Sequence, residues 1–263
     1  MTCGALIFAF NNEATDYVSM AAWSAGRIRH HLGIPVAVVT NSTDSTLSQT
    51  FDQVIHTEPE SGGTRFFEDY NSTVTWHNAG RVDAYSLTPW EQTLVLDADY
   101  VVASSQLSLV LDSNRDFMCH RTAMNIATGY PLAGLNVFGD HSMPMWWATV
   151  MMFRKSNTAQ YIFDCMQMIH ANWEHYRALY GINNRTYRND FALSIAVGIV
   201  SGQTGKVDQI PWPLMSALPE NRIVHVAEDC YQIDIESARY SMWNGQDFHA
   251  MGKHHLENII AAH

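Results

Sequence analysis

The chain has 263 residues, of which 47% are hydrophobic and 16% charged, a composition that supports a packed globular core and excludes wholesale disorder. Its formal charge of −11 argues against nucleic acid or an anionic membrane surface as a default partner, because like charges repel. The four cysteines form no CxxC pair, so neither a zinc site nor a disulfide framework is predicted. The sequence shows no leader with a basic flank and no apolar run of the roughly 20 residues that span a bilayer. We therefore expect a soluble cytoplasmic protein of bacterial or viral type without a membrane span.

The first third of the chain alternates strand-like and helix-like segments. Short apolar runs at 5–10, 35–40 and 52–56 predict buried strands, and apolar residues at helical spacing predict a helix over 16–32 that ends at Gly33. Strand, helix and strand in this order indicate a parallel sheet with right-handed crossovers. Ligands bind at the carboxyl ends of the strands in such sheets.

The middle of the chain is less regular. Residues 57–75 are rich in Gly, Ser, Thr and acids and are expected to form a long surface loop. A helix is predicted over 78–87, and an apolar strand over 93–96 follows it. Residues 120–145 lack periodicity and are expected to be irregular.

The last part again shows clear patterns. A strand is predicted over 146–153, a long amphipathic helix over 158–180, and a second helix over 190–200. A strand follows at 223–226, and the tail 247–263 is expected to begin as a polar loop and end in a short helix. Without repeats or linkers, we expect one α/β domain whose mostly parallel central sheet is flanked by helices.

The sharpest local feature is the segment Leu94-Val95-Leu96-Asp97-Ala98-Asp99, an apolar strand that ends in two acids separated by the small Ala98. Two carboxylates at the carboxyl edge of a sheet offer the hard oxygen ligands that suit Mg²⁺ or Mn²⁺ carrying a diphosphate. For the triplet alone, a solvated turn whose acids cap the next segment is the alternative interpretation.

Two further segments give this acid pair a context. Residues 81–90 lead from a helix that carries Arg81, through a proline turn, into the acidic strand, and residues 249–253 have the sequence His-Ala-Met-Gly-Lys. With these motifs the chain resembles the GT-A-fold glycosyltransferases, and particularly glycosyltransferase family 8, which includes glycogenin and bacterial galactosyltransferases. The resemblance implies a metal-dependent transferase that uses a nucleotide-sugar, of the UDP type, and retains the anomeric configuration.

The resemblance also implies a set of metal ligands and a cation for the diphosphate. Asp97, Asp99 and His249 would hold the ion, and a mixed carboxylate and imidazole set suits Mn²⁺ better than Mg²⁺. Gly252 and Lys253 would lie against the diphosphate. Lys253 follows the glycine directly, whereas the family has a spacer there, so His254 or His255 is an alternative for this role.

Other positions follow from the same resemblance. Phe10, Asn11 and Glu13 fall where GT-A enzymes bind the base and ribose, and Ala98 adjoins the donor. Arg81 stands where the family places a basic residue near the donor, and it is also a candidate catalytic residue.

At the start of the helix over 190–200, Asn189 and Asp190 stand in place of an acidic triplet of the family. Asp190 is the other candidate catalytic residue, and a helix N-cap is the alternative role.

The resemblance divides the single domain into a nucleotide-binding half, 1–115, and an acceptor-side half, 116–263, whose tail binds metal and diphosphate. The acceptor is open among a saccharide, a protein and a modified DNA base, and the oligomeric state is open too. Two alternatives compete with sugar transfer, a nucleotidyltransferase and a nucleotide-sugar-binding protein with a degenerate site. The first is disfavoured because the loop at 11–15 lacks the Gly and Lys that hold a triphosphate.

Overall fold

The computed structural model of the chain describes residues 2–61, 63–67, 72–77, 79–132, 134–202, 207–227, 230–235, 238–243 and 245–262. Within them, a central sheet has the strand order β3-β2-β1-β6-β12-β8. Its strands are β1 (Cys3–Phe8), β2 (Val36–Thr40), β3 (Gln53–His56), β6 (Gln92–Asp97), β8 (Phe117–His120) and β12 (Trp147–Arg154). Strands β3, β2, β1 and β6 run parallel, and β12 is antiparallel to both of its neighbours. The predicted α/β architecture with a mostly parallel sheet is confirmed.

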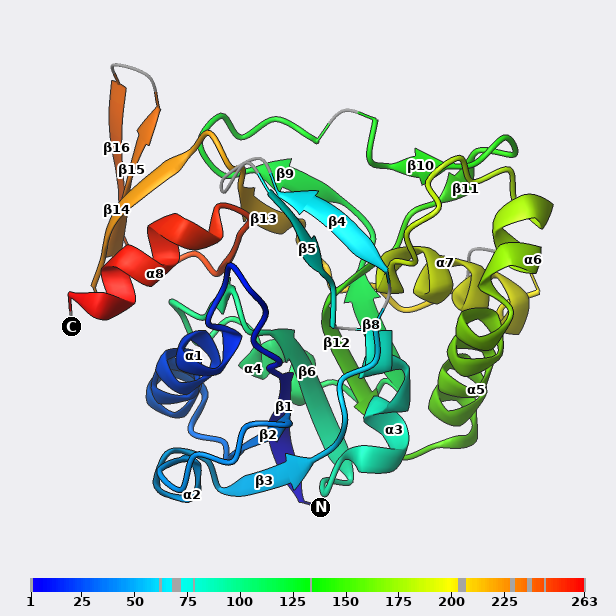
Figure 1. Cartoon of the computed structure of the whole chain (residues 1–263), viewed down its shortest axis with the longest axis horizontal. Helices are drawn as coiled ribbons and strands as arrows, with labels where there is room; N and C mark the ends of the chain where they lie inside the picture. Colours follow the sequence, from blue (N-terminus) through cyan, green and yellow to red (C-terminus); the bar gives the residue numbers. More distant parts are fainter. Residues whose placement is uncertain are drawn as a thin grey trace.

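Helices cover both faces of this sheet, which explains why its inner strands are apolar at almost every position. In Figure 1, helix α1 (Tyr17–Leu32) lies on one side of the sheet, and α3 (Ala84–Leu87) and α5 (Asn157–Ala171) lie on the other. The predicted boundaries of α1 are nearly correct because both ends are encoded locally. Asp16 accepts a hydrogen bond from the Ser19 N–H at 3.0 Å, and Gly33 ends the helix with a positive φ of 66°.

A second sheet lies beside the carboxyl end of β6. It has the order β7-β17-β13-β9, formed by β7 (Tyr100–Val101), β17 (Phe248–Ala250), β13 (Leu214–Ala217) and β9 (Ala123–Asn125). Strand β17 runs antiparallel to β7, with His249 opposite Tyr100. The C-terminal segment is therefore fastened directly beside the residues that follow β6.

The remaining elements complete the layers. They are α2 (Leu47–Thr50), β4 (Thr64–Phe67), β5 (Ser72–Thr75), the 3₁₀ helix η2 (Ala79–Asp83), α4 (Ser108–Leu111), β10 (Val137–Phe138), β11 (Met143–Pro144), α6 (Trp173–Leu179), α7 (Asn189–Val200), β14 (Arg222–Val226), β15 (Cys230–Ile235), β16 (Ala238–Trp243) and α8 (Lys253–Ala261). Strands β14, β15 and β16 form a separate antiparallel sheet that projects past α8 (Figure 1). Among the described helices, none is both long and apolar enough to cross a bilayer.

Several predicted segments are corrected by pairings between distant parts of the chain. The stretch 57–75 is not a plain loop, because β4 and β5 pair as an antiparallel hairpin, although 62 and 68–71 lie outside the described residues. The stretch 120–145 contains β9, β10 and β11, and β9 is held by β13 about 90 positions later. The start of the tail is strand β17 rather than a polar loop. Such short stretches carry little local β signal, and pairing with distant partners decides their conformation.

Two helices also differ from the prediction. The helix expected over 158–180 is divided into α5 and α6 at Asn172, whose backbone is not helical and whose Nδ2 donates to the Met168 carbonyl at 2.9 Å. Asparagine competes with helical hydrogen bonds in this way. The helix expected over 78–87 starts as the 3₁₀ helix η2 before α3, and Asn78 lies outside the described residues.

Candidate metal and donor site

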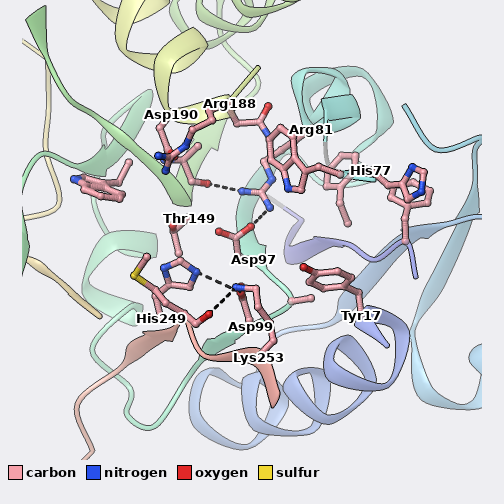
Figure 2. Close-up of a pocket in the computed structure, with 18 of the residues that line it drawn as sticks. Tyr17, His77, Arg81, Asp97, Asp99, Thr149, Arg188, Asp190, His249 and Lys253 are labelled. Carbon is pink, nitrogen blue, oxygen red and sulfur yellow. Dashed lines mark hydrogen bonds and ion pairs between the residues drawn. The ribbon is translucent and has the colours of Figure 1, made fainter. Parts of the chain in front are cut away.

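A cavity of about 340 Å³ opens at the carboxyl ends of β1 and β6, where parallel α/β sheets bind ligands. Its walls come from both halves of the chain, as Figure 2 shows. The lining residues are Phe8, Phe10, Tyr17, Trp76, His77, Arg81, Asp97, Ala98, Asp99, Trp147, Ala148, Thr149, Arg188, Asn189, Asp190, Pro219, His249, Met251 and Lys253.

Asp97, Asp99 and His249 meet in this cavity, and one ligand atom from each lies within 4.8 Å of the others. Asp97 is the last residue of β6, and Asp99 follows after the buried Ala98. His249 reaches them because β17 pairs with β7, a contact reinforced by a 2.9 Å hydrogen bond from the Ala250 N–H to the Asp99 carbonyl. Two carboxylates and an imidazole fit Mn²⁺ or Mg²⁺, so the residues present suit the implied ion.

Asp99 is buried and is held between two nitrogen groups. The Lys253 ammonium forms an ion pair with its Oδ2, and His249 Nε2 lies 3.4 Å from the same oxygen. Burial alone would raise the pKa of the Asp99 carboxyl, but Lys253 and His249 outweigh it and hold that pKa well below its usual range. Asp99 is therefore ionised at neutral pH, as a metal ligand must be.

Asp97 has a different cation. Arg81, only 2% exposed, pairs with Asp97 Oδ1 through Nη2, and its Nη1 donates to the Ala148 carbonyl at 2.9 Å. Burial lowers the pKa of Arg81 to about 10, while the nearby carboxylates of Asp190 and Asp99 oppose that shift. The guanidinium thus stays charged at neutral pH, and it is fixed from two sides.

Asp190 lies across the cavity with both of its carboxylate oxygens occupied. Oδ1 accepts the Ala148 N–H at 2.9 Å, and Oδ2 accepts from Arg188 Nη2 at 2.7 Å. The pairing of β12 with β8 shifts register between Trp147 and Met151, and this irregularity frees the Ala148 N–H for the carboxylate. The backbone of Ala148 therefore connects Asp190 to Arg81, because its N–H donates to Asp190 and its carbonyl accepts from Arg81.

The residues expected to bind base and ribose divide into two groups. Phe10 lines the cavity, whereas the exposed Asn11 and Glu13 are not among its described lining residues. Asn11 Oδ1 instead accepts the Val18 N–H at 2.9 Å, at the start of α1. Gly252 likewise stays behind the wall, where a Cβ would approach Pro219 and the His255 ring.

Among the lining residues that the sequence interpretation missed are Tyr17, Trp76, His77 and Pro219. Tyr17 opens α1 directly after the β1 loop, and Trp76-His77 precede η2, which carries Arg81. The sequence offered one signal for these residues, namely aromatic side chains close to the end of a strand and to η2. Their distance from one another in the sequence hid their convergence.

No protein-family model matches the chain, and no curated protein is detectably similar to it in sequence. Solved structures nevertheless resemble it. An active-site mutant of LgtC is 12% identical, over 78% of this chain and 72% of that one, with a TM-score of 0.51. The glycosyltransferase GlyE of Streptococcus pneumoniae TIGR4 is 10% identical over 80% of this chain, with a TM-score of 0.46, and mouse xyloside xylosyltransferase 1 is 9% identical over 77% of this chain and 83% of that one, with a TM-score of 0.45.

This chain spans 46% of the length of GlyE. The match to LgtC shows that the chain shares the fold of that protein, and it agrees with the GT-A architecture expected from the resemblance to family 8.

Proposed function

We propose that this protein is a metal-dependent glycosyltransferase that moves a sugar from a nucleotide-sugar, of the UDP type, to an acceptor. The observation that carries the proposal is the convergence of Asp97, Asp99 and His249 at the strand ends of a GT-A fold. LgtC, which resembles this chain in fold, is a galactosyltransferase that has been solved with donor and acceptor sugar analogues.

The chemistry of sugar transfer requires what these residues provide. A nucleoside diphosphate leaves easily only when its developing negative charge is neutralised. The bound ion would supply part of that charge as a Lewis acid. Asp97, Asp99 and His249 would hold the ion, and Lys253 would approach the diphosphate from the start of α8. The aromatic rings of Phe10 and Tyr17 would form the wall for the base and ribose.

The acceptor side is assigned to the residues across the cavity. With both oxygens of Asp190 engaged by Ala148 and Arg188, that residue is better suited to hold the wall in place than to accept a proton. This arrangement agrees with retention of the anomeric configuration, in which no dedicated base is needed. The donor half, 1–115, and the acceptor half, 116–263, then meet at the cavity, with the tail residues His249 and Lys253 closing the donor end.

The direct test is release of UDP from a panel of UDP-sugars with and without Mn²⁺. We compare the parent protein with His249→Gln, because this change removes one metal ligand and leaves the Asp99 and Lys253 charges paired. Turnover in the parent should require Mn²⁺ and disappear with a chelator. His249→Gln should lose at least tenfold, an estimate that follows from losing one ligand of a catalytic ion.

The matched control is Asp164→Asn, which removes an exposed acid on α5 that lies outside the cavity. This variant should keep the activity of the parent. Equal turnover by His249→Gln and the parent would refute the metal assignment. Absence of UDP release from every donor, with no thermal stabilisation by UDP and Mn²⁺, would favour the alternative of a protein without transferase activity.

A further inference from the structure

The charged groups of the cavity are arranged in pairs. Among the described residues that line it, each aspartate contacts an Arg or Lys side chain from another position. The pairs are Asp97 with Arg81, Asp99 with Lys253, and Asp190 with Arg188. The formal charges of these six side chains cancel, so the cavity has no surplus of negative charge to attract a divalent ion by itself.

Two of the three pairs use the metal ligands themselves. An ion that binds Asp97 and Asp99 comes into the immediate neighbourhood of Arg81 and Lys253, and like charges in a buried site repel strongly. Both cations are among the buried charged residues of the protein, so water screens them little. The two ion pairs therefore compete with a divalent ion for the same carboxylates.

The two cations differ in their freedom to move. Arg81 is fixed by the Ala148 carbonyl as well as by Asp97 and is almost wholly enclosed. Lys253 is the first residue of α8, and besides Asp99 its Nζ reaches only a long 3.5 Å contact to the Met251 carbonyl among the interactions described for it. Its flexible side chain borders the cavity, as Figure 2 shows, so it can turn from the carboxylate toward a ligand there.

We propose that the Asp99–Lys253 pair makes metal binding conditional on a diphosphate, so that the site takes the divalent ion and the nucleoside diphosphate together as one nearly neutral unit. The ion alone would add two positive charges to a cavity whose side-chain charges already cancel. The diphosphate of a nucleotide-sugar contributes about two negative charges, so the ion and the diphosphate together leave the net charge of the cavity unchanged. Lys253 leaves Asp99 to the ion and pairs with the diphosphate. This inference rests on the proposed function and adds to it the rule by which the site is loaded.

Mn²⁺ binding measured by electron paramagnetic resonance tests the rule without an activity assay. The probes are Mn²⁺ alone, Mn²⁺ with UDP, and Mn²⁺ with inorganic pyrophosphate, after correction for Mn²⁺ bound to free UDP or pyrophosphate. In the parent, UDP should raise the affinity for Mn²⁺ at least tenfold. By linkage, Mn²⁺ should raise the affinity for UDP by the same factor, which calorimetry measures on the unmodified protein.

Lys253→Met supplies the decisive comparison, with the exposed Lys155→Met as its control. Removing the competing ammonium should raise the affinity for Mn²⁺ alone about tenfold and shrink the enhancement by UDP, while Lys155→Met should behave like the parent. Unchanged or weaker Mn²⁺ binding by folded Lys253→Met would overturn the proposal. If this variant does not fold, the coupling factor of the parent decides, and a factor near one overturns it.

The outcomes distinguish a failure of the conditional loading from a failure of the proposed function. Tight Mn²⁺ binding whose affinity is the same with and without UDP or pyrophosphate would contradict the conditional loading and remain compatible with the proposed function. Enhancement by pyrophosphate but not by UDP would support the loading rule and contradict a uridine donor. Failure to bind Mn²⁺ under every condition would contradict both proposals.

Discussion

The buried pair of Asp99 and Lys253 should be strongly coupled in stability, and a double-mutant cycle can measure this coupling. The two side chains are only 6% and 11% exposed, so either charge left alone would be buried without compensation. Removing one partner of such a pair costs about 3–5 kcal/mol. At contact and an effective dielectric of about 20, the attraction is about 4–5 kcal/mol, from which desolvation subtracts a part. We therefore expect Asp99→Asn and Lys253→Met to show a coupling energy of about 2–3 kcal/mol.

The assay is urea unfolding at pH 7 in the presence of a chelator, applied to the parent, both single variants and the double variant. The Asp99 carboxyl is ionised at this pH because its pKa is held far below it. The matched control is the surface pair Glu174 and Arg177 on α6, in which Glu174 is 73% exposed. Its cycle should give no more than about 0.5 kcal/mol. Additive effects at Asp99 and Lys253 would refute the claim that the two charges depend on each other.

Two further predictions concern buried polar groups outside the cluster of Asp97, Asp99 and His249. Burial lowers the pKa of His120 to about 4, against a smaller upward effect of its contact with the Trp212 carbonyl. In the unfolded chain His120 binds a proton below about pH 6.5, whereas in the folded protein it stays neutral down to about pH 4. The free energy of unfolding should therefore fall by about 3 kcal/mol as the pH drops through this window. Denaturant titrations from pH 7 to 4 should show that this fall in the free energy of unfolding is absent in His120→Asn. The same pH dependence in the variant and the parent would contradict the assignment. The Ser194 hydroxyl accepts a hydrogen bond from the buried backbone N–H of Trp146 at 2.7 Å, so Ser194→Ala should lower the free energy of unfolding in urea by about 2 kcal/mol. The control Ser48→Ala, at an exposed position, should change this free energy little. Equal effects of the two changes would count against this role of Ser194.

The sequence predicted the central architecture because its signals are local. The apolar runs of β1, β2 and β6 and the capped helix α1 all appear close to their expected bounds. The placement of Asp97 at the carboxyl end of a buried strand required no knowledge of distant contacts, since a strand that runs into Asp-X-Asp carries both carboxylates with it. The expected strand at 146–153 also forms, but its antiparallel direction could not be read from its residues.

The weaker predictions fell where conformation depends on a partner far away. The strands β4, β5, β9 and β17 are too short to show a clear alternation of apolar and polar residues, and cross-strand pairing defines them. Loop closure over many residues precedes such pairing, and local periodicity does not report it. For the same reason the convergence of Trp76 and Tyr17 on one cavity was missed.

By itself, then, the sequence pattern predicted a mostly parallel sheet with a strand that ends in two carboxylates, and the resemblance to family 8 added the tail motif with His249 and Lys253. Only the tertiary structure decided how these groups are used. It brings His249 beside Asp99 through the β17–β7 pairing, and it assigns Arg81 to Asp97 and Lys253 to Asp99. Residue type and spacing specify which charges are present, whereas the low-dielectric cavity that makes each pair interdependent exists only after distant strands and helices have packed around it.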